Sequence, residues 1–268
     1  MAEIYVGTSG YDYPEWRGLF YANELPREEF LAFYAEHFRA LELNYTYYGM
    51  PEERQIASMV RRSNGRLKFS IKAHKSLTHE ISVSAWRDAA KEFRAALYPM
   101  VNRGLLLSLL FQFPQSFHYA VDERRYLDSL MREFEGLPRV VEFRHDSWQA
   151  KGVVERVTAG LSERGIGWCV TDMPGLRHLP TFRPVATAPV TYVRLHGRNA
   201  ASWHGTNARD RYDYLYSDAE LESFLPAITA IGASAQVVQI YFNNHAKGQA
   251  VVNARKMKIL CDSIVSPP

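Results

Sequence analysis

Charged and polar side chains alternate with apolar ones at the ends of several short runs of the sequence. Glu142 and Arg144 alternate with valine and phenylalanine, and Arg194 and His196 alternate with valine and leucine. In a strand, alternate side chains point to opposite faces, so each polar pair shares one face. A carboxylate and an imidazole can transfer protons, and guanidinium groups bind anions. The pattern therefore predicts an acid–base site with anion-binding groups.

The elements that must position these residues are short strands separated by helices. Eight β-like runs occur, at 4–9, 41–45, 67–72, 105–113, 140–144, 168–172, 190–196 and 237–243. Apolar residues with helical spacing lie between them, as in 26–38, and follow the last run at 250–261. Such alternation predicts a parallel sheet. With 268 residues, the chain suits an α/β fold, a single (β/α)8 TIM-type barrel with residues 1–268 as one domain.

The sixth crossover departs from this pattern. Residues 173–189 contain Pro174, Pro180, Pro184 and Pro189. Proline lacks a backbone N–H and clashes inside a helix. We therefore expect an irregular segment here in place of a crossover helix.

Polar residues are expected to gather at the C-terminal mouth of the barrel. An unpaired charge inside a barrel costs roughly several kcal/mol, whereas the mouth offers solvent and is where barrels of this type place their sites. The residues expected to line it are Glu42, Asn44, Lys72, Gln112, Glu142, Arg144, Asp172, Arg194, His196, Tyr241 and Asn243. Three carboxylates match three cations in this set, so a neutral ion-pair network that closes the barrel is the alternative. The further amide and imidazole groups favour a ligand site.

A divalent metal ion is another candidate occupant of the mouth. Glu142, Asp172 and His196 end successive strands and offer three ligands with an open position. Arg144 and Arg194 lie on the same faces and would repel a cation. We therefore expect no cofactor, and a divalent metal ion remains the less favoured alternative.

The loops after the last two strands suit a phosphate group, which barrels of this kind often bind there. Asn243 and Asn244 precede the closing helix, whose N-terminal amides attract anions. Asparagine is also a common helix cap, so a purely structural role for both residues is the alternative.

Aromatic residues are frequent in the loops that follow the strands. They are Tyr11, Tyr13, Trp16, Tyr45, Tyr47, Tyr48, Trp148, Trp203, Tyr212 and Tyr214. Flat rings with polar edges stack on bases or sugars, so this rim favours a nucleotide-like ligand. Packing beneath loops is the commoner use of such residues and is the alternative for each of them.

Composition limits the partners and the location of the protein. The 32 Lys and Arg residues against 29 Asp and Glu leave a net charge of +3, which allows a nucleic-acid partner without requiring one. The longest apolar stretch, 105–111, is far shorter than the roughly 20 residues that span a bilayer, so no membrane partner is expected. Cys169 and Cys261 form no CxxC pair, and we expect a reducing, cytoplasmic location.

Six ordered segments carry a family resemblance. They are GTSGYDYPEWRGLFY (7–21), LELNYTYYGMP (41–51), FQFPQSF (111–117), VEFRHDSW (141–148), YVRLHG (192–197) and IYFNNHAKGQAVVNA (240–254). Together they resemble the YecE-like family, also called domain of unknown function 72, over nearly the whole chain. The resemblance implies a TIM-type barrel, distantly similar in fold to endonuclease IV and xylose isomerase-like proteins, and implies no established reaction.

The first functional hypothesis is an enzyme, a hydrolase or a lyase, that acts on a phosphorylated or nucleotide-like substrate at the mouth. Glu142 would be the general acid or base with His196 as its partner, and Asp172 is the third candidate catalytic residue. The anionic group would be held by Arg144, Arg194 and Lys72 and oriented by Asn243 and Asn244. The alternatives are a noncatalytic nucleic-acid-binding module and a metal-dependent phosphodiesterase or isomerase. The sequence does not indicate an oligomeric state.

Overall fold

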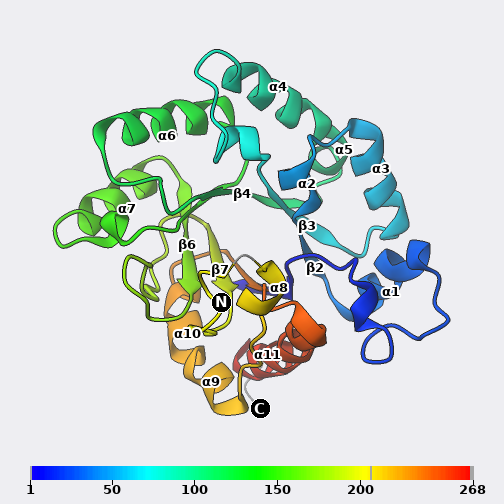
Figure 1. Cartoon of the computed structure of the whole chain (residues 1–268). Coiled ribbons are helices and arrows are strands. Elements are labelled where there is room, and N and C mark those ends of the chain that lie inside the picture. The colour runs from blue at the N-terminus through cyan, green and yellow to red at the C-terminus, as the bar shows by residue number, and fades with distance from the viewer. Residues whose placement is uncertain (1, 206, 266–268) are drawn as a thin grey trace.

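Eight parallel strands form a nearly closed barrel with helices on its outside in the computed structural model, which describes residues 2–205 and 207–265 (Figure 1). The strands are β1 (Glu3–Thr8), β2 (Ala40–Leu43), β3 (Lys68–Lys72), β4 (Leu106–Phe113), β5 (Arg139–Phe143), β6 (Ile166–Asp172), β7 (Val190–Leu195) and β8 (Val237–Phe242). The order in the sheet is β1-β8-β7-β6-β5-β4-β3-β2. The architecture is the predicted (β/α)8 TIM-type barrel.

The helices surround the barrel. The α-helices are α1 (Phe30–His37), α2 (Tyr45–Tyr48), α3 (Glu53–Arg62), α4 (Trp86–Ala96), α5 (Tyr98–Val101), α6 (Val121–Glu133), α7 (Val154–Glu163), α8 (Ala208–Arg211), α9 (Asp218–Ser223), α10 (Leu225–Gly232) and α11 (Gln249–Val265). Short 3₁₀ turns are η1 (Pro14–Trp16), η2 (Arg27–Glu29), η3 (Lys75–Leu77), η4 (Asp146–Gln149) and η5 (Ala246–Gly248). The helix expected at 26–38 begins only after Pro26, which has an extended backbone, and consists of η2 followed directly by α1.

The barrel closes at a seam between β1 and β2. The amide of Gly10 donates to the carbonyl of Glu42 over 2.8 Å, and Ser9 forms an isolated bridge with Glu42. A Cβ on Gly7 would lie 2.2 Å from the carbonyl oxygen of Ala40. Glycine is therefore required at this position for the two strands to approach.

The sixth crossover is irregular, as the prolines predict. Residues 173–189 contain no helix, and the chain passes from β6 to β7 through turns and extended backbone. Among the described residues, no helix has both the length and the apolar character needed to cross a membrane.

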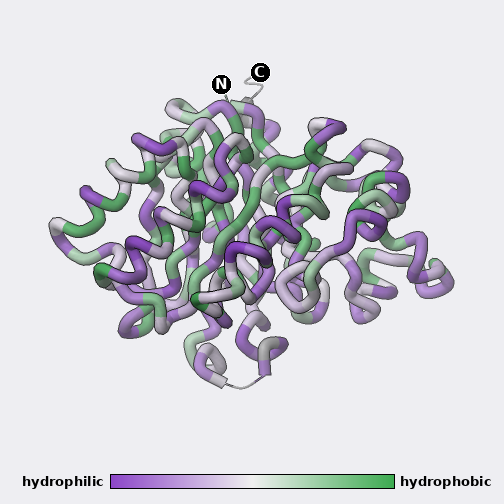
Figure 2. The backbone as a smooth tube through the Cα atoms, turned by 90° about the horizontal axis from the view of Figure 1, so that it is seen from above, coloured by the Kyte–Doolittle hydropathy of each residue, from purple (hydrophilic) through white to green (hydrophobic). Residues whose placement is uncertain are grey.

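Apolar side chains fill the space between strands and helices, while the barrel interior is largely polar towards its mouth. Val141, Phe143 and Leu195 belong to the outer core. Hydrophilic stretches lie mostly in the outer helices and loops, and apolar stretches run through the middle of the molecule (Figure 2). Deeper in the interior, the hydroxyls of Ser70 and Tyr241 lie 2.9 Å apart. Opposite the apolar residues of β5 and β7, Glu142, Arg144, Arg194 and His196 contact one another inside the barrel, as the alternation predicts.

Candidate functional site

Arg194 is the centre of a buried charge network inside the barrel. Its Nε and Nη2 donate to the two carboxylate oxygens of Glu42 over 2.9 and 2.7 Å, and its Nη1 donates to Glu142 over 2.6 Å. The hydroxyl of Tyr192 donates to Glu42 over 2.7 Å. All four side chains are buried, so these charge-assisted bonds replace the hydration that the groups lose.

The network continues from Glu142 towards the mouth. Arg144 donates through Nε to Glu142, and its Nη2 lies 3.2 Å from Nε2 of His196. On the other side of the ring, Nδ1 of His196 lies 3.0 Å from the side-chain amide nitrogen of Asn243. This chain of contacts fixes the orientation of Arg144.

The surroundings set the protonation states of Glu142 and His196. Burial alone would raise the pKa of Glu142, but the charges of Arg144 and Arg194 outweigh it and hold that pKa well below the usual range. Burial, followed by the charge of Arg144, lowers the pKa of His196 to about 3. At neutral pH Glu142 is therefore an ionised acceptor and His196 a neutral imidazole.

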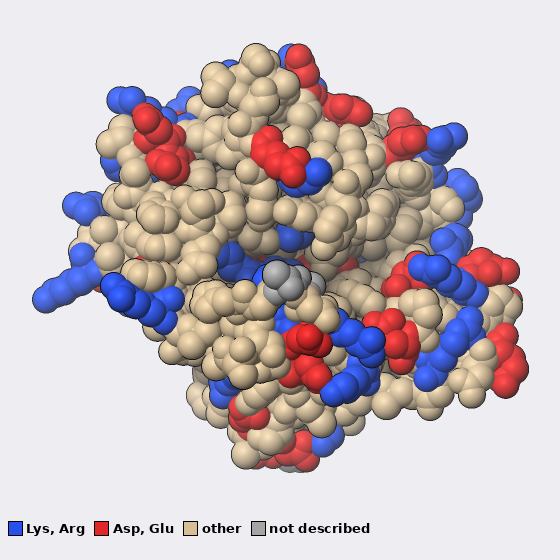
Figure 3. Space-filling view, in the orientation of Figure 1, with Lys and Arg blue, Asp and Glu red and all other residues tan. Residues whose placement is uncertain are grey.

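A cavity of about 330 Å³ lies at the mouth, and we call it the mouth pocket. Its lining consists of Tyr47, Tyr48, Lys72, His79, Gln112, Pro114, Gln115, Arg144, Leu179, Trp203, His204, Arg211 and Tyr212. Figure 3 shows lysine and arginine surface inside the hollow at the centre of this face. No Asp or Glu occurs in the described lining, so the pocket presents positive charge, neutral donors and aromatic rings.

Lys72 is the most unusual group of the mouth pocket. Its ammonium nitrogen lies 4.0 Å from the ring centroid of Tyr47. The ion pairs formed by the described residues include none with Lys72, although the carboxylates of Glu42 and Glu142 are paired nearby with arginines. Burial, followed by the charges of Arg194 and Arg144, lowers the pKa of Lys72 to about 7. The amine therefore exchanges its proton near neutral pH.

The structure brings together most of the predicted mouth residues, but in two levels. Lys72, Gln112 and Arg144 line the pocket, and Glu42, Glu142, Arg194, His196 and Asn243 form the buried network that holds Arg144. The alternative prediction, an ion-pair network that closes the barrel, therefore describes the buried lower level. The upper level is an open cavity.

Asp172 does not join this group. It lies on the outward face of β6, where Arg198 donates to both of its carboxylate oxygens and the hydroxyl of Tyr216 donates to Oδ2 over 2.6 Å. The expected convergence of Asp172 with Glu142 and His196 is therefore absent, and these three residues do not form a ligand set for a metal.

Three further predicted residues lie away from the pocket lining. Tyr241 lies deeper in the barrel against Ser70. Asn44 precedes α2 and its side-chain oxygen has no hydrogen-bond partner among the described residues. The buried amide of Asn244 donates to the carbonyl of Tyr214 and to Asn253 over 2.8 Å each. Asn244 thus holds the β7–β8 connection onto α11.

The region before α11 is closed to a phosphate group. A Cβ on Gly248 would lie 2.3 Å from a methyl of Leu19, and the indole of Trp16 donates to the carbonyl of His245 over 3.0 Å. The η1 turn and the residues after it therefore cover the position at which the sequence suggested an anion site.

The aromatic rim divides into two groups. Tyr47, Tyr48, Trp203 and Tyr212 line the mouth pocket. Of the others, Tyr45 is exposed, and the rest pack beneath loops or beside other elements; Trp148, for example, stacks on Phe143 with ring centroids 3.9 Å apart. His79, His204 and Arg211 also line the pocket, and sequence reasoning missed them because loop positions carry no facing pattern.

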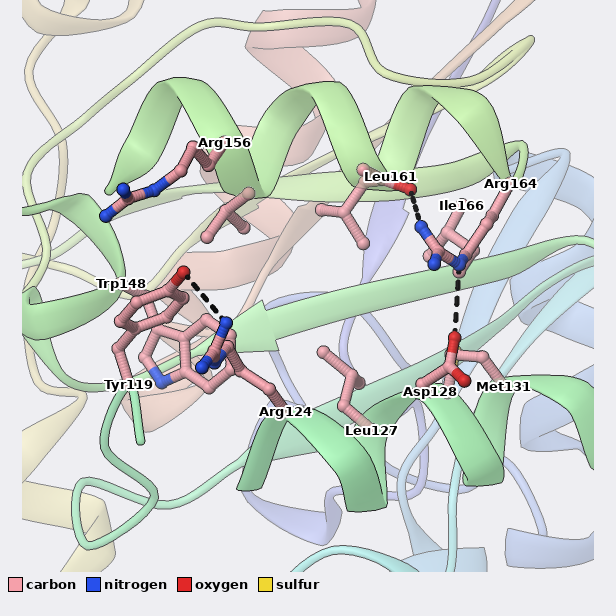
Figure 4. A pocket seen from close by; sticks show the side chains of 12 residues that line it. Tyr119, Arg124, Leu127, Asp128, Met131, Trp148, Arg156, Leu161, Arg164 and Ile166 are labelled. Atoms are coloured by element: carbon pink, nitrogen blue, oxygen red, sulfur yellow. Dashed lines mark hydrogen bonds and ion pairs between the residues drawn. The ribbon is translucent and has the colours of Figure 1, made fainter. Parts of the chain in front are cut away.

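A second cavity, of about 280 Å³, lies on the outside of the barrel between α6 and α7 (Figure 4). Leu127 and Leu161 lie in its walls, and Arg164 donates to Asp128 across it over 3.1 Å. Arg164 and Asp128 pair with each other at the protein surface. We therefore regard this cavity as a gap between the two helices.

Comparisons with known proteins agree with the family resemblance. The model of the family described as "Protein of unknown function DUF72" matches residues 5–265. The UPF0759 protein YunF of Bacillus subtilis is 28% identical over 271 residues, which is 97% of this chain and 95% of that protein.

Two solved structures show the same fold. A DUF72 family protein from Thermotoga maritima is 33% identical, with a TM-score of 0.87 over 97% of this chain and 99% of that one. A DUF72 family protein from Enterococcus faecalis is 24% identical, also with a TM-score of 0.87, over 97% and 95% of the two chains. By sequence and by structure, the chain belongs to the DUF72 family of barrel proteins.

Proposed function

We propose that the protein is an enzyme that acts by acid–base chemistry, as a hydrolase or a lyase, on a small phosphorylated or nucleotide-like substrate in the mouth pocket. The observation that carries the proposal is the placement of Lys72. Its amine opens onto the pocket beside Arg144 and has no carboxylate partner among the described residues. An unpaired amine in a positively charged pocket needs an anion or works as a base.

Lys72 is suited to proton transfer at neutral pH. A general base is most effective when its pKa lies near the operating pH, and the pKa of Lys72 is about 7. Neutral lysine can remove a proton from a substrate or from water and return it later. We therefore assign the proton transfer to Lys72 in place of Glu142.

Glu142 and His196 become positioning residues in this proposal. Both are fully buried and outside the pocket lining, and both contact Arg144. They hold the guanidinium with one edge towards the pocket, where it can bind a phosphate or carboxylate group.

The lining favours a substrate with an anionic end and a flat ring. Arg144 and Arg211 supply positive charge, while Tyr47, Trp203 and Tyr212 supply faces on which a base or a sugar can stack. The two buried thiols, Cys169 and Cys261, fit our expectation of a cytoplasmic location.

The test is a screen of nucleotides and sugar phosphates with detection of released phosphate and of product by NMR. For a compound that is turned over, Lys72→Met should lower kcat at least ~100-fold, which is the typical contribution of a general acid or base. Lys68→Met is the matched control, because Lys68 is on the same strand with its amine over the ring of Tyr5. Full activity of Lys72→Met would remove lysine from the mechanism.

A second candidate, a noncatalytic module for single-stranded nucleic acid, is favoured by the exposure of Tyr48. This residue lines the pocket and is 76% exposed, so it offers a ring to a longer chain of bases. Binding of an oligonucleotide should then weaken with salt, with a slope that reports the number of phosphate contacts. Absence of binding at low salt would exclude this candidate.

A further inference from the structure

Two histidines and an aspartate meet beside the mouth pocket but outside its lining. His145 and Asp146 follow β5, and His178 belongs to the irregular sixth crossover. Each of the three residues offers one potential ligand atom, and these atoms all lie within 4.8 Å of one another. The mechanism proposed above uses none of them.

The spacing of the ligand atoms is suitable for a metal ion. Nδ1 of His145 lies 3.4 Å from Oδ1 of Asp146, and Nδ1 of His178 lies 3.8 Å from Oδ2. Ligand bonds of about 2.0–2.2 Å around a tetrahedral zinc ion place neighbouring ligand atoms roughly 3.3–3.6 Å apart. Small side-chain rotations are therefore enough to bring the three atoms onto one ion.

The imidazole of His145 is prepared for this role. Its Nδ1 accepts a hydrogen bond from the amide of Ser147 over 3.1 Å, so this nitrogen carries a free electron pair and the proton is on Nε2. A bound metal would take the place of the Ser147 amide at Nδ1.

The other two residues are accessible and held in position. Asp146 and His178 are about half exposed, and the amide of Asp146 donates to the carbonyl of His178 over 3.2 Å. His178 has a left-handed backbone, with φ of 66°, which a residue with a side chain seldom adopts.

We propose that His145, Asp146 and His178 bind a transition-metal ion of the zinc type, with water in the remaining position. Two imidazoles and one carboxylate are the ligands that such an ion accepts. The site would tie the sixth crossover to the segment after β5. Because Leu179 lines the mouth pocket, the metal fixes one wall of that pocket without contacting the substrate.

The test uses the full chain without a histidine tag, freed of metal with a chelator and titrated with Zn²⁺ by calorimetry. One equivalent should bind per chain. Co²⁺ should bind at the same place and show the absorption of a four-coordinate ion with nitrogen and oxygen ligands. Zinc should also slow hydrogen exchange in residues 173–182.

Variants distinguish the site from general surface binding. His178→Asn and Asp146→Asn should each weaken zinc binding at least ~100-fold, more than removal of an outer partner does. His118→Asn is the matched control, since His118 stacks on His145 at 3.9 Å but is not among the three ligands. It should lower the affinity by no more than about 10-fold, the lower end of the range for an outer contact.

Failure to bind one equivalent, or equal loss of binding in all three variants, would overturn the proposal. Circular dichroism of each variant confirms that it is folded before titration. The outcome is independent of the enzyme assay, because zinc binding is read directly.

Discussion

The guanidinium of Arg194 and the carboxylate of Glu42 face each other inside the barrel, joined by two hydrogen bonds of 2.9 and 2.7 Å. They come from β7 and β2, which are not neighbours in the sheet. The pair therefore links strands on different sides of the barrel interior, directly below the pocket residues. Its integrity sets the geometry of Glu142 and, through it, of Arg144.

Removal of the Glu42 charge should destabilise the protein strongly. Glu42→Gln leaves Arg194 buried with one carboxylate in place of two, and breaking a buried ion pair costs about 3–5 kcal/mol. Urea denaturation measures the change in the free energy of unfolding. Asp12→Asn is the control, because its pair with Arg27 is exposed and should contribute at most about 1 kcal/mol. Equal changes in the free energy of unfolding for the two substitutions would show that the buried pair stabilises the protein no more than the exposed pair does.

Substitution of Lys72 should change the dependence of stability on pH. An unfolded lysine titrates near pH 10.4 and folded Lys72 near 7, so between these values the unfolded chain holds a proton that the folded chain lacks. This contribution to stability is complete above about pH 10.4 and is lost as the pH falls towards 7. The Lys72→Met variant has no amine to titrate, so it does not lose this stability at low pH. The free energy of unfolding of the variant minus that of the unmodified protein should therefore be greatest below pH 7 and should decline as the pH rises.

Denaturation of both proteins at several pH values between 6 and 10 gives this difference directly. Lys68→Met controls for the removal of one positive charge from the same strand. A difference between Lys72→Met and the unmodified protein that does not vary with pH would contradict the lowered pKa of Lys72.

His196 should stay neutral throughout the physiological range. Because its pKa is lowered to about 3, its stabilising contribution is present above about pH 6.5 and is lost as the pH falls towards 3. NMR of the histidine ring protons should show no titration of His196 between pH 5 and 8, with His196→Gln used to assign the signal. A midpoint near 6.5 would place His196 in contact with solvent and return it to the candidates for proton transfer.

Tyr216 should matter for folding and not for the mouth pocket. Its hydroxyl donates to Asp172 and accepts from the amide of Gly197 over 2.8 Å. Tyr216→Phe leaves both partners short of a buried bond, at a cost of about 1–3 kcal/mol in denaturation. The affinity for a nucleotide found in the screen should remain within about twofold, because no new charge enters the pocket. Loss of nucleotide binding would assign Asp172 to the site after all.

The sequence predicts the barrel and much of the charge network because alternation is clear in β5 and β7. Valine, phenylalanine and leucine on one face leave Glu142, Arg144, Arg194 and His196 on the other, and the structure brings these four together. β6 is different, since the consecutive residues Trp168, Cys169 and Val170 are all apolar and give no alternation. The sequence of β6 therefore contains no alternation from which the direction of the Asp172 side chain could be predicted.

The division into a closed network and an open pocket could not be predicted from facing alone. Side chains on the same inward face lie at different depths, and depth depends on the stagger of the strands and on which loops fold over the mouth. His79, Trp203 and Arg211 come from such loops and complete the pocket. A local sequence pattern does not predict the position that a loop side chain takes in the folded protein.

The central claim is that Lys72 is a reactive amine in an accessible, anion-binding pocket. Pyridoxal 5′-phosphate, an aldehyde with a phosphate group, tests it at pH 7.5 when the imine is reduced with borohydride and the labelled lysines are identified by mass spectrometry. The account predicts that Lys72 is labelled ahead of the exposed Lys91 and that inorganic phosphate protects it. Labelling of Lys91 with Lys72 unmodified would contradict the account.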